Sequence, residues 1–303
     1  MNQWTLTRIS ITNQFILKLV MLLLIMVQTS CSPSTDEPIK SLRIAVLPDR
    51  SADELKKRFN PLVEHLKNEL DIEIEFVIVK DYQDLLNKFQ RKEVDLVRFG
   101  GYSFINASIN SGALPLVMRD VDVHFHSYFL VQADSTATTL EDYKGKRFSF
   151  GSKLSTSGHL MPRYFLSLEN ITPESYFSEV LYSGAHDKTA EWVKTAHVDL
   201  AVANAVIIDR LYQQGSITTE QVRILSRTPP YSDYVWAIQN NFPTSLKNKI
   251  TEAFLKLSIA NPNDKKILDA VGAKMYIPAR QDDFKSLESI ARQLKLITPH
   301  ENK

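Results

Sequence analysis

Short apolar segments alternate with amphipathic helical segments through most of this 303-residue chain, and this alternation constrains its fold more than any other feature. In the first unit, an apolar segment at 42–47 is followed by Ser51-Ala52-Asp53-Glu54, which matches a capping box and opens a helical pattern to Leu70. Such alternation predicts a mostly parallel sheet with helices on both faces. In sheets of this kind, ligands bind outside the carboxyl ends of the strands.

The chain contains two series of these units, separated by a β-rich segment at 124–132. The first series is predicted to have strands at 42–47, 72–79, 94–99 and 114–118, and helices at 51–70, 82–91 and 102–110. The second is predicted to have strands at 147–150, 176–182, 198–203 and 222–225, and helices at 158–168, 187–195 and 205–213. A strand at 234–239 would return the chain to the first series, and helices at 243–257, 264–271 and 284–296 close it.

We therefore expect an α/β fold with two lobes, each a mostly parallel sheet flanked by helices, and a two-stranded hinge between them. Lobe 1 is predicted to comprise residues 42–126 and 240–303, and lobe 2 residues 127–239.

One strand–helix junction in the second series is rich in small hydroxyl residues. The strand at 147–150 is followed by Ser155-Thr156-Ser157-Gly158, and a helical pattern then continues to Leu168. The first turn of a helix has unpaired backbone N–H groups and a partial positive charge, so it can hold an oxyanion, and hydroxyl side chains add donors. The alternative is an ordinary Ser/Thr helix cap, which needs no ligand.

The first 30 residues have the pattern of a secretory signal. They contain Arg8 and Lys18 but no acidic residue, and the nine-residue apolar run 19–27 is shorter than the roughly 20 residues of a membrane span. Cys31 follows directly and resembles the lipidated cysteine of a bacterial lipoprotein. We therefore predict a signal peptide at 1–30 and a polar tether at 31–41. The protein would then lie in the cell envelope, anchored by its lipid and facing the periplasm or the exterior.

An ordinary secreted protein with a free Cys31 is the alternative to the lipoprotein. Because Cys31 is the single cysteine, no intramolecular disulfide can form. Without residues 1–30 the chain has 34 basic and 35 acidic residues, since the signal removes two of the 36 basic ones. This near-neutral charge argues against a general nucleic-acid binder, and we expect a monomer.

Several segments, in order along the chain, resemble motifs of the PhnD-like family of phosphonate-binding proteins, the extracytoplasmic solute-binding components of ABC importers. Val94-Asp95-Leu96 followed by Phe99-Gly100-Gly101-Tyr102 resembles the family element VDxxxFGPxxY, and residues 155–163 match STSGxxxPR. In addition, residues 140–146 match LxDLKGK, 183–187 resemble xGxHD and 198–201 resemble VDAG. The similarity extends over about residues 42–290.

The resemblance implies a type II periplasmic-binding fold, whose two lobes close over a ligand by hinge motion. It also implies that Ser155, Thr156, Ser157 and Gly158 hold a phosphorus oxyanion. Tyr102 matches the family tyrosine that reaches the ligand from the first lobe. His186 matches the histidine of the HD element and is expected to donate to an anionic oxygen.

Three positions depart from the family pattern. Gly101 replaces the usual proline, and Arg98 replaces an uncharged residue. Asn204 and its neighbours offer no carboxylate to recognise an aminoalkyl group, which argues against an aminophosphonate ligand. Arg50 and Arg98 are candidate basic residues of the cleft, because a charge-assisted bond strengthens oxyanion binding. Tyr128 is a candidate for its hinge-side wall.

Other assignments of the polar residues are weaker. His124 and His126 share one face of a strand, but the sequence offers no third metal ligand at a convincing spacing. Ser155, His186 and Asp187 contain the residue types of a hydrolase, yet Gly-x-Ser-x-Gly is absent and the adjacent His and Asp orient each other poorly. Asp187 is instead expected to be a helix N-cap, and Tyr231 and Tyr234 are expected to pack in the hinge.

The expected function is capture of a small anionic ligand (phosphonate, phosphite, phosphate or an ester) for an ABC permease, without catalysis and without a metal or redox cofactor. The alternative is a ligand-sensing module that signals through a separate membrane histidine kinase. The sequence does not identify the organic part of the ligand.

Overall fold

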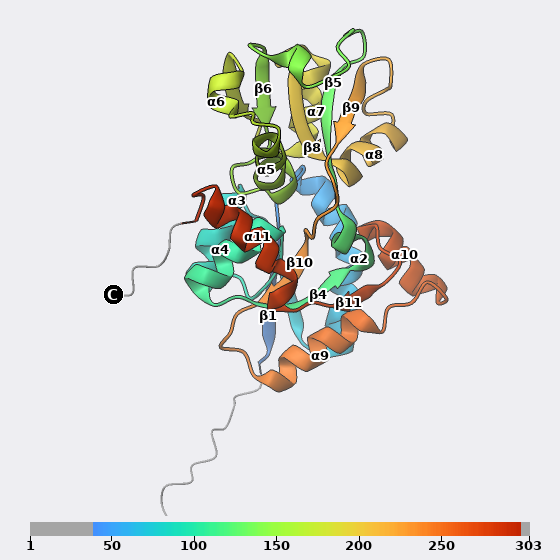
Figure 1. The fold of residues 1–303 in the computed structure, drawn as a ribbon. Helices are drawn as coiled ribbons and strands as arrows, with labels where there is room; N and C mark the ends of the chain where they lie inside the picture. The colour runs from blue at the N-terminus through green and yellow to red at the C-terminus, as the bar shows by residue number, and fades with distance from the viewer. Residues whose placement is uncertain (1–38, 298–303) are drawn as a thin grey trace, which may run out of the picture. The chain divides into compact units, whose positions relative to one another are not determined.

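Residues 39–297 are described by the structure, a computed structural model, and they form two lobes, each built on its own β-sheet (Figure 1). The predicted signal peptide, Cys31 and the tether up to Pro38 lie outside the described residues. The two-lobed α/β architecture expected from the sequence is confirmed.

Lobe 1 holds a sheet of six strands within the described range. Its strands are β1 (Ser41–Val46), β2 (Glu73–Val77), β3 (Leu96–Phe99), β4 (Leu114–Arg119), β10 (Val235–Ile238) and β11 (Tyr276–Pro278). Its helices are α2 (Ala52–Leu70), α3 (Tyr82–Gln90), α4 (Gly101–Ser111), α9 (Thr244–Leu255), α10 (Pro262–Val271) and α11 (Lys285–Gln293), with short 3₁₀ turns at Asp120–His124 and Gln281–Phe284.

Lobe 2 holds a sheet of five strands within the same described range. Its strands are β5 (Ser127–Gln132), β6 (Arg147–Phe150), β7 (Glu179–Tyr182), β8 (Leu200–Asn204) and β9 (Val222–Arg227). Its helices are α5 (Met161–Leu168), α6 (Pro173–Tyr176), α7 (His186–Lys194) and α8 (Ala205–Gln213), with a 3₁₀ turn at Glu141–Tyr143.

The two sheets share one arrangement of strands. The order is β2-β1-β3-β10-β4-β11 in lobe 1 and β7-β6-β8-β5-β9 in lobe 2. Most strands of each sheet run in one direction, as expected from the sequence, but both sheets are mixed: β11 lies antiparallel to β4 at one edge of the lobe 1 sheet. The strand by which the chain enters a lobe, β10 or β5, lies antiparallel between strands of that lobe's own series. Series strands end at the boundary between the lobes, whereas an entering strand begins there and runs the opposite way.

The strand expected at 234–239 is β10, and it belongs to the lobe 1 sheet. The chain has therefore returned to lobe 1 by Val235, within the range 127–239 that the sequence assigned to lobe 2. The hinge consists of the two segments that lead to β5 and to β10. Phe125 and Tyr231 exchange backbone hydrogen bonds of 2.8 and 3.0 Å, and the N–H of Thr228 donates to the carbonyl oxygen of Ser127 at 3.0 Å.

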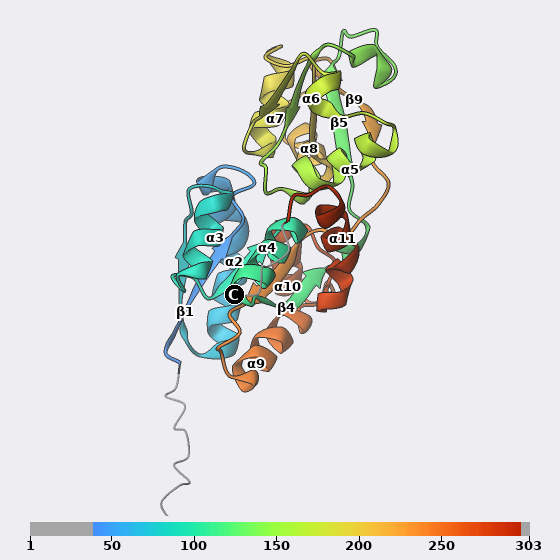
Figure 2. The ribbon, with the colours of Figure 1, turned by 60° about the vertical axis from the view of Figure 1, so that its left-hand side comes forward.

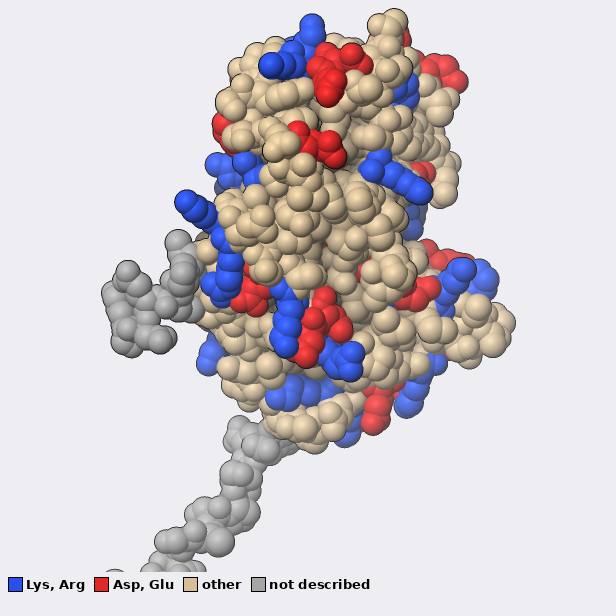
Figure 3. All heavy atoms as spheres, in the orientation of Figure 1, with Lys and Arg blue, Asp and Glu red and all other residues tan. Residues whose placement is uncertain are grey.

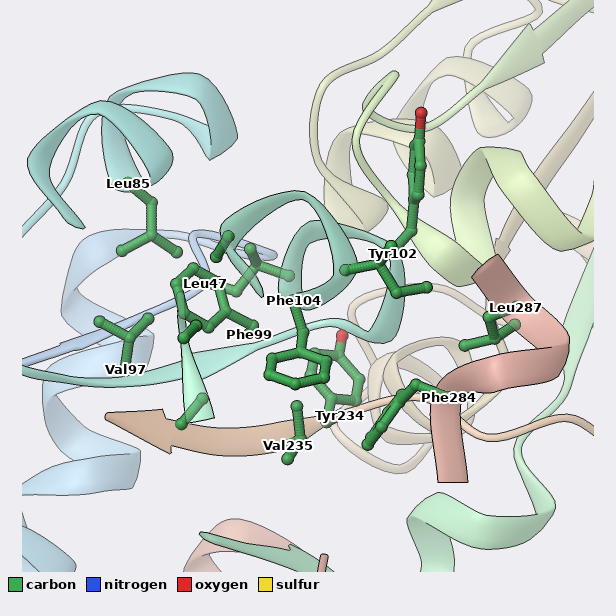
Figure 4. Close-up of a cluster of buried hydrophobic side chains, with 14 of the residues drawn as sticks. Leu47, Leu85, Val97, Phe99, Tyr102, Phe104, Tyr234, Val235, Phe284 and Leu287 are labelled. Carbon is green, nitrogen blue, oxygen red and sulfur yellow. The ribbon is translucent and has the colours of Figure 1, made fainter. Parts of the chain in front are cut away.

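Both faces of each sheet are covered by helices, as Figures 1 and 2 show. In lobe 1, α2, α9 and α10 cover the face that carries Leu42 and Ile44, and α3, α4 and α11 cover the face that carries Val97 and Phe99. Figure 4 shows this second face, where Leu85, Phe104 and Leu287 meet the sheet, among other side chains. In lobe 2, α5 packs on one face and α7 and α8 on the other.

Local sequence signals account for most element boundaries. The side chain of Ser51 accepts a hydrogen bond from the N–H of Glu54 and caps α2, and Pro61 lies inside this continuous helix. The sequence did not indicate α6 or β11, which have four and three residues, too few to display a period.

The surface carries mixed charge: Figure 3 shows basic and acidic side chains interspersed over one face of the molecule. Within residues 39–297, no helix is both long enough and apolar enough to cross a membrane.

Candidate functional site

The Ser155–Gly158 loop begins a widened helical turn at the carboxyl end of β6. Thr156–Leu160 form a π-turn, in which the N–H of Leu160 donates to the carbonyl oxygen of Ser155 at 3.0 Å. Helix α5 continues directly from this turn. The three hydroxyl residues are each at most 2 % exposed. The hydroxyl cluster that the sequence predicted therefore lies at a buried helix start.

Ser155 is a helix cap whose hydroxyl also meets residues from other elements. Its Oγ accepts a hydrogen bond from the N–H of Gly158 at 2.9 Å and lies 3.5 Å from Nε2 of His186. The hydroxyl of Tyr82, at the start of α3 in lobe 1, is also hydrogen-bonded to Ser155. The capping and binding-site interpretations are therefore compatible for this residue.

Thr156 connects the loop to the N-terminus of α4. Its Oγ1 accepts a hydrogen bond from the backbone N–H of Tyr102 at 2.9 Å, and its side chain is hydrogen-bonded to Asp233 in the hinge. The cap residue of α4 is Gly100, which contributes no side-chain hydrogen bond. The N-termini of two helical segments, one from each lobe, thus converge on the hydroxyl of Thr156.

Gly101 explains one departure from the family pattern. Its N–H donates to Oδ1 of Asp233 at 3.1 Å, a bond that a proline at this position could not make. A Cβ on Gly101 would lie 2.6 Å from Cδ1 of Leu287, so no larger side chain fits without rearrangement.

Asp233 is a buried carboxyl group that the sequence reasoning missed. Its Oδ2 is buried without a hydrogen-bond partner among the described residues. Burial raises the pKa of Asp233 to about 7, against the opposing hydrogen bonds from Thr156 and Gly101. At neutral pH this carboxyl group is therefore partly protonated, and it can donate a hydrogen bond as well as accept one. A carboxylate among the aromatic residues 231–236, where the chain re-enters lobe 1, was the available signal.

His186, the histidine of the HD-like element, lies against the loop. Its Nδ1 accepts a hydrogen bond from the N–H of Asn204 at 3.2 Å, so the proton of the neutral ring is on Nε2, which faces Ser155. Burial lowers the pKa of His186 to about 4. The ring is therefore neutral at pH 7 and presents an N–H donor to the loop.

Gly158 allows this close approach of His186. A Cβ on Gly158 would lie 2.9 Å from Cε1 of His186 and 3.0 Å from Oγ of Ser155. Real Cβ atoms do not approach other atoms so closely, and glycine is therefore needed here for packing.

Ser157 contributes its backbone to the hinge side of the loop. Its carbonyl oxygen accepts a hydrogen bond from Oγ of Ser127 at 2.7 Å, and Oγ of Ser127 lies 2.5 Å from the hydroxyl of Tyr231. Tyr231 therefore does more than pack in the hinge. Ser127 was not singled out from the sequence, although it begins the strand that enters lobe 2.

Tyr102 meets the loop through its backbone and not through its ring. The hydroxyl group donates to the carbonyl oxygen of Leu296 at 3.0 Å, and Figure 4 shows the ring directed away from Phe104 and Tyr234. Burial raises the pKa of the Tyr102 hydroxyl.

The structure does not bring Tyr128 to the loop. Its hydroxyl donates to Oδ2 of Asp209 on α8 at 3.3 Å, and its ring packs against the core of lobe 2 beside α7 and α8.

Arg50 and Arg98 are both buried at the boundary between the lobes, with Asp49 between them. Nε of Arg50 lies 3.4 Å from Oδ1 of Asp49, and Nη1 of Arg98 lies 3.7 Å from Oδ2. Burial alone would raise the pKa of Asp49, but Arg50, Arg98 and Arg58 lower it to about 2. Both candidate arginines therefore lie inside the molecule, on the lobe 1 side.

Asn204, Tyr234 and Asp49 link these arginines to His186. Nδ2 of Asn204 donates to the hydroxyl of Tyr234 at 2.9 Å, and this hydroxyl donates to Oδ2 of Asp49 at 2.7 Å. The N–H of His186 also donates to the carbonyl oxygen of Asp49 at 3.3 Å. Tyr234 is therefore part of a buried polar network and not simply hinge packing.

The hydrolase and metal interpretations find no support in this geometry. Nδ1 of His186 is held by a backbone N–H, and the carboxylate of Asp187 accepts from the N–H of Lys188, so no carboxylate orients the histidine. Asp187 is not the cap of α7 either, since Ala185 occupies that position. Nδ1 of His126 lies 2.8 Å from the carbonyl oxygen of Thr228. Residues 39–297 contain no group of three or more His, Cys, Asp or Glu placed to hold a metal ion.

Comparison with known proteins identifies the family. Residues 44–284 match the family model described as ABC transporter, phosphonate, periplasmic substrate-binding protein. The chain is 32% identical over 278 residues to the probable ABC transporter phosphite binding protein PhnD1 of Prochlorococcus marinus (strain MIT 9301), covering 88% of this chain and 93% of that one. It is 26% identical to the phosphonates-binding periplasmic protein of Escherichia coli (strain K12), covering 88% and 80%.

A solved structure agrees with these matches. The structure of PhnD1 from Prochlorococcus marinus (MIT 9301) in complex with methylphosphonate superimposes with a TM-score of 0.80 at 31% identity, covering 85% of this chain and 99% of that one. These relatives are substrate-binding proteins and not enzymes. The chain therefore belongs to the family of periplasmic substrate-binding proteins of phosphonate ABC transporters.

Proposed function

We propose that this protein captures a small phosphorus oxyanion, namely a phosphonate, phosphite, phosphate or phosphate ester, and delivers it to an ABC permease. The observation that carries the proposal is the convergence of the Ser155–Gly158 loop, the N-terminus of α4 and Nε2 of His186. Neutral hydroxyls, backbone N–H groups and an imidazole N–H are the donors that an oxyanion needs.

Each group has a distinct part in this proposal. The hydroxyls of Ser155 and Thr156 donate to the oxyanion once they release their present partners. The N–H of Tyr102, which now donates to Thr156, is freed for the ligand by the same change. Neutral His186 adds a further donor from α7.

Asp233 is suited to a ligand that still carries a proton. With a pKa of about 7, its carboxyl group shares a proton with a phosphorus oxygen at neutral pH, whereas two full charges would repel each other. The hydroxyls, the backbone N–H groups and His186 do not change their own protonation near neutral pH, so Asp233 is the group whose proton can follow that of the ligand.

The proposal includes the location of the protein. Cys31 would be lipidated after removal of residues 1–30, and the polar segment up to Lys40 would tether the two lobes to the membrane. The protein would act as a monomer beside its permease, facing the periplasm or the exterior.

Calorimetry with methylphosphonate, phosphite and phosphate tests the binding function. Wild-type protein should bind at least one of them, and the double variant Ser155→Ala/Thr156→Ala should lose binding while keeping its circular-dichroism spectrum. Ser175→Ala/Thr195→Ala is the matched control, because it removes two exposed hydroxyls in lobe 2 that bond only to carbonyls of their own helical turns. Unchanged affinity in the loop variant would reject the proposed site.

Cell fractionation tests the anchor separately. Protein with Cys31 should appear in the membrane fraction, and the Cys31→Ala variant should appear in the soluble extracytoplasmic fraction. Equal distribution of the two would contradict lipidation.

A further inference from the structure

Four arginine side chains surround one small buried cavity at the boundary between the lobes. We call it the arginine chamber; its charged lining consists of Asp49, Arg50, Arg58, Arg98 and Arg119. The remaining lining comes from Phe125 and Tyr234 in the hinge region and from Asn204, Val206 and Ile207 in lobe 2. Its volume is about 10 Å³, which is room for about one water molecule. Four guanidinium groups thus face a single carboxylate in the chamber wall.

Two of the four arginines are mostly committed to the protein. Arg119 makes a bidentate pair with Asp122, with bonds of 2.8 and 2.5 Å. Arg119 and Arg58 also donate to the carbonyl oxygen of Val271, at the C-terminal end of α10, at 2.6 and 2.5 Å. These contacts explain how the two charges are held, although Nε of Arg58 still has no acceptor among the described residues.

Arg98 is the arginine of the four that has the weakest polar contacts with the protein. Its guanidinium stacks on the ring of Tyr234, with Cζ 3.6 Å from the ring centroid. Its nearest carboxylate, Asp49, is 3.7 Å away and already accepts from Tyr234. Nη1 of Arg98 is buried and has no hydrogen-bond acceptor among the described residues. A buried guanidinium held flat with a free edge is preorganised to bind an anion.

Arg50 connects the chamber to the outside. Besides the chamber, it lines two open clefts between the lobes, of about 480 and 460 Å³. Its guanidinium forms two long ion pairs, from Nε to Oδ1 of Asp49 at 3.4 Å and from Nη1 to Oε2 of Glu54 at 3.3 Å. Arg50 is therefore the residue that the chamber shares with both clefts.

The chamber also adjoins the proposed oxyanion site. Asn204 lines the chamber, and its N–H donates to His186, whose other nitrogen faces Ser155. Asn204 and His186 thus lie between the chamber and the loop, and a ligand with a short spacer would have to reach past them to contact both.

We propose that the arginine chamber binds a carboxylate of the ligand, joined by a short spacer to the phosphorus oxyanion held at the Ser155–Gly158 loop. This inference rests on the proposed function and narrows its substrate class to small phosphonocarboxylates. A carboxylate oxygen matches the unpartnered Nη1 of the stacked Arg98 guanidinium, and the water-sized space of the chamber has room for one such oxygen at that nitrogen. The same arginines disfavour a ligand with an amino group at that end.

Calorimetry with phosphonoacetate, methylphosphonate and 2-aminoethylphosphonate tests the inference. Wild-type protein should bind phosphonoacetate at least about tenfold more tightly than methylphosphonate, as one charge-assisted contact predicts, and 2-aminoethylphosphonate most weakly. Arg98→Gln and Arg50→Gln should each remove most of the phosphonoacetate advantage and change methylphosphonate affinity less than about threefold.

Arg43→Gln is the matched control, because Arg43 pairs with Asp95 in the same sheet but lies outside the chamber. If Arg98→Gln does not fold, Arg50→Gln at the cleft edge still decides the question. Equal wild-type affinities for phosphonoacetate and methylphosphonate would overturn the inference while leaving the proposed function intact. Equal losses of affinity for phosphonoacetate and methylphosphonate in Arg98→Gln and Arg50→Gln would also overturn the inference. Absence of binding by any phosphorus compound would instead reject the proposed function, and the inference with it.

Discussion

The backbone N–H of Tyr102 donates a hydrogen bond to Oγ1 of Thr156, 2.9 Å away, and so joins lobe 1 to lobe 2. The two residues belong to two of the family-like segments of the sequence, 94–102 and 155–163. They meet through the main-chain N–H of Tyr102, while the hydroxyl of its side chain donates to the carbonyl oxygen of Leu296. The site is therefore organised around two helix N-termini more than around aromatic side chains.

Replacement of Thr156 by valine should weaken ligand binding and also reduce stability. The substitution keeps the shape of the side chain but leaves the buried N–H of Tyr102 without its acceptor, which costs about 1–3 kcal/mol. We expect methylphosphonate affinity to fall by about tenfold, as loss of one donor to an oxyanion predicts. Calorimetry and urea unfolding measure the two effects. Thr195→Val, at an exposed helix end, should change neither; a loss as large as that of the Thr156 variant would refute the assignment.

Asp233→Asn should stabilise the protein at alkaline pH. Because the folded-state pKa of about 7 lies above the ordinary value of 3.8 for an aspartate, the protonated form is favoured by folding. This carboxyl group therefore favours folding most below pH 4, and its contribution declines as the pH rises towards 7. Three pKa units correspond to at most about 4 kcal/mol.

Asparagine cannot ionise but keeps an oxygen for the N–H of Gly101. The difference in unfolding free energy between Asp233→Asn and wild type should grow between pH 4 and pH 7 and then level off, as followed by urea titrations at several pH values. A difference that is independent of pH would show that Asp233 is ionised normally in the folded protein.

His186→Asn should weaken ligand binding without destabilising the fold at neutral pH. The asparagine Oδ1 can replace Nδ1 as acceptor for the N–H of Asn204, but nothing replaces the Nε2 donor. We expect little change in unfolding free energy at pH 7.5 and a loss of about tenfold in methylphosphonate affinity. Retained affinity would exclude His186 from the site.

The same variant should alter acid sensitivity. A histidine whose folded-state pKa is about 4 stabilises the fold fully above its ordinary value of 6.5, and this contribution is lost as the pH falls from 6.5 to 4. Wild-type protein should therefore lose more stability than His186→Asn over that interval, which thermal unfolding at pH 7.5, 5.5 and 4.5 measures.

Gly101→Pro should destabilise this protein, although the family pattern that this segment resembles has proline at the position. Proline at the first position of a helix is normally favourable. Here it would remove the N–H that donates to Asp233 and bring a Cβ to 2.6 Å from Leu287. Gly101→Ala keeps the N–H and brings its Cβ against the same Leu287 side chain. The additional loss of unfolding free energy in the proline variant therefore measures the hydrogen bond to Asp233. Equal unfolding free energies for the two variants would assign the whole effect to packing.

The sequence determined the elements and the chemical nature of the loop. Helix α8 was predicted at its observed residues, and α2 begins at the capping box of Ser51, because periodicity and capping depend on residues within a few positions of one another. The Ser-Thr-Ser-Gly segment was likewise recognised from its residues alone, and the alternation of strands and helices predicted two lobes.

Tertiary structure decided which groups meet at the site. Whether Tyr102 presents its ring or its N–H depends on how α4 packs against α11 and lobe 2, and no local pattern records that choice. Arg50, Arg58, Arg98 and Arg119 come from separate elements, and only the packing of the two lobes buries them around one cavity. Local sequence patterns set backbone conformation, whereas burial and pairing of charges depend on contacts between residues far apart in the chain.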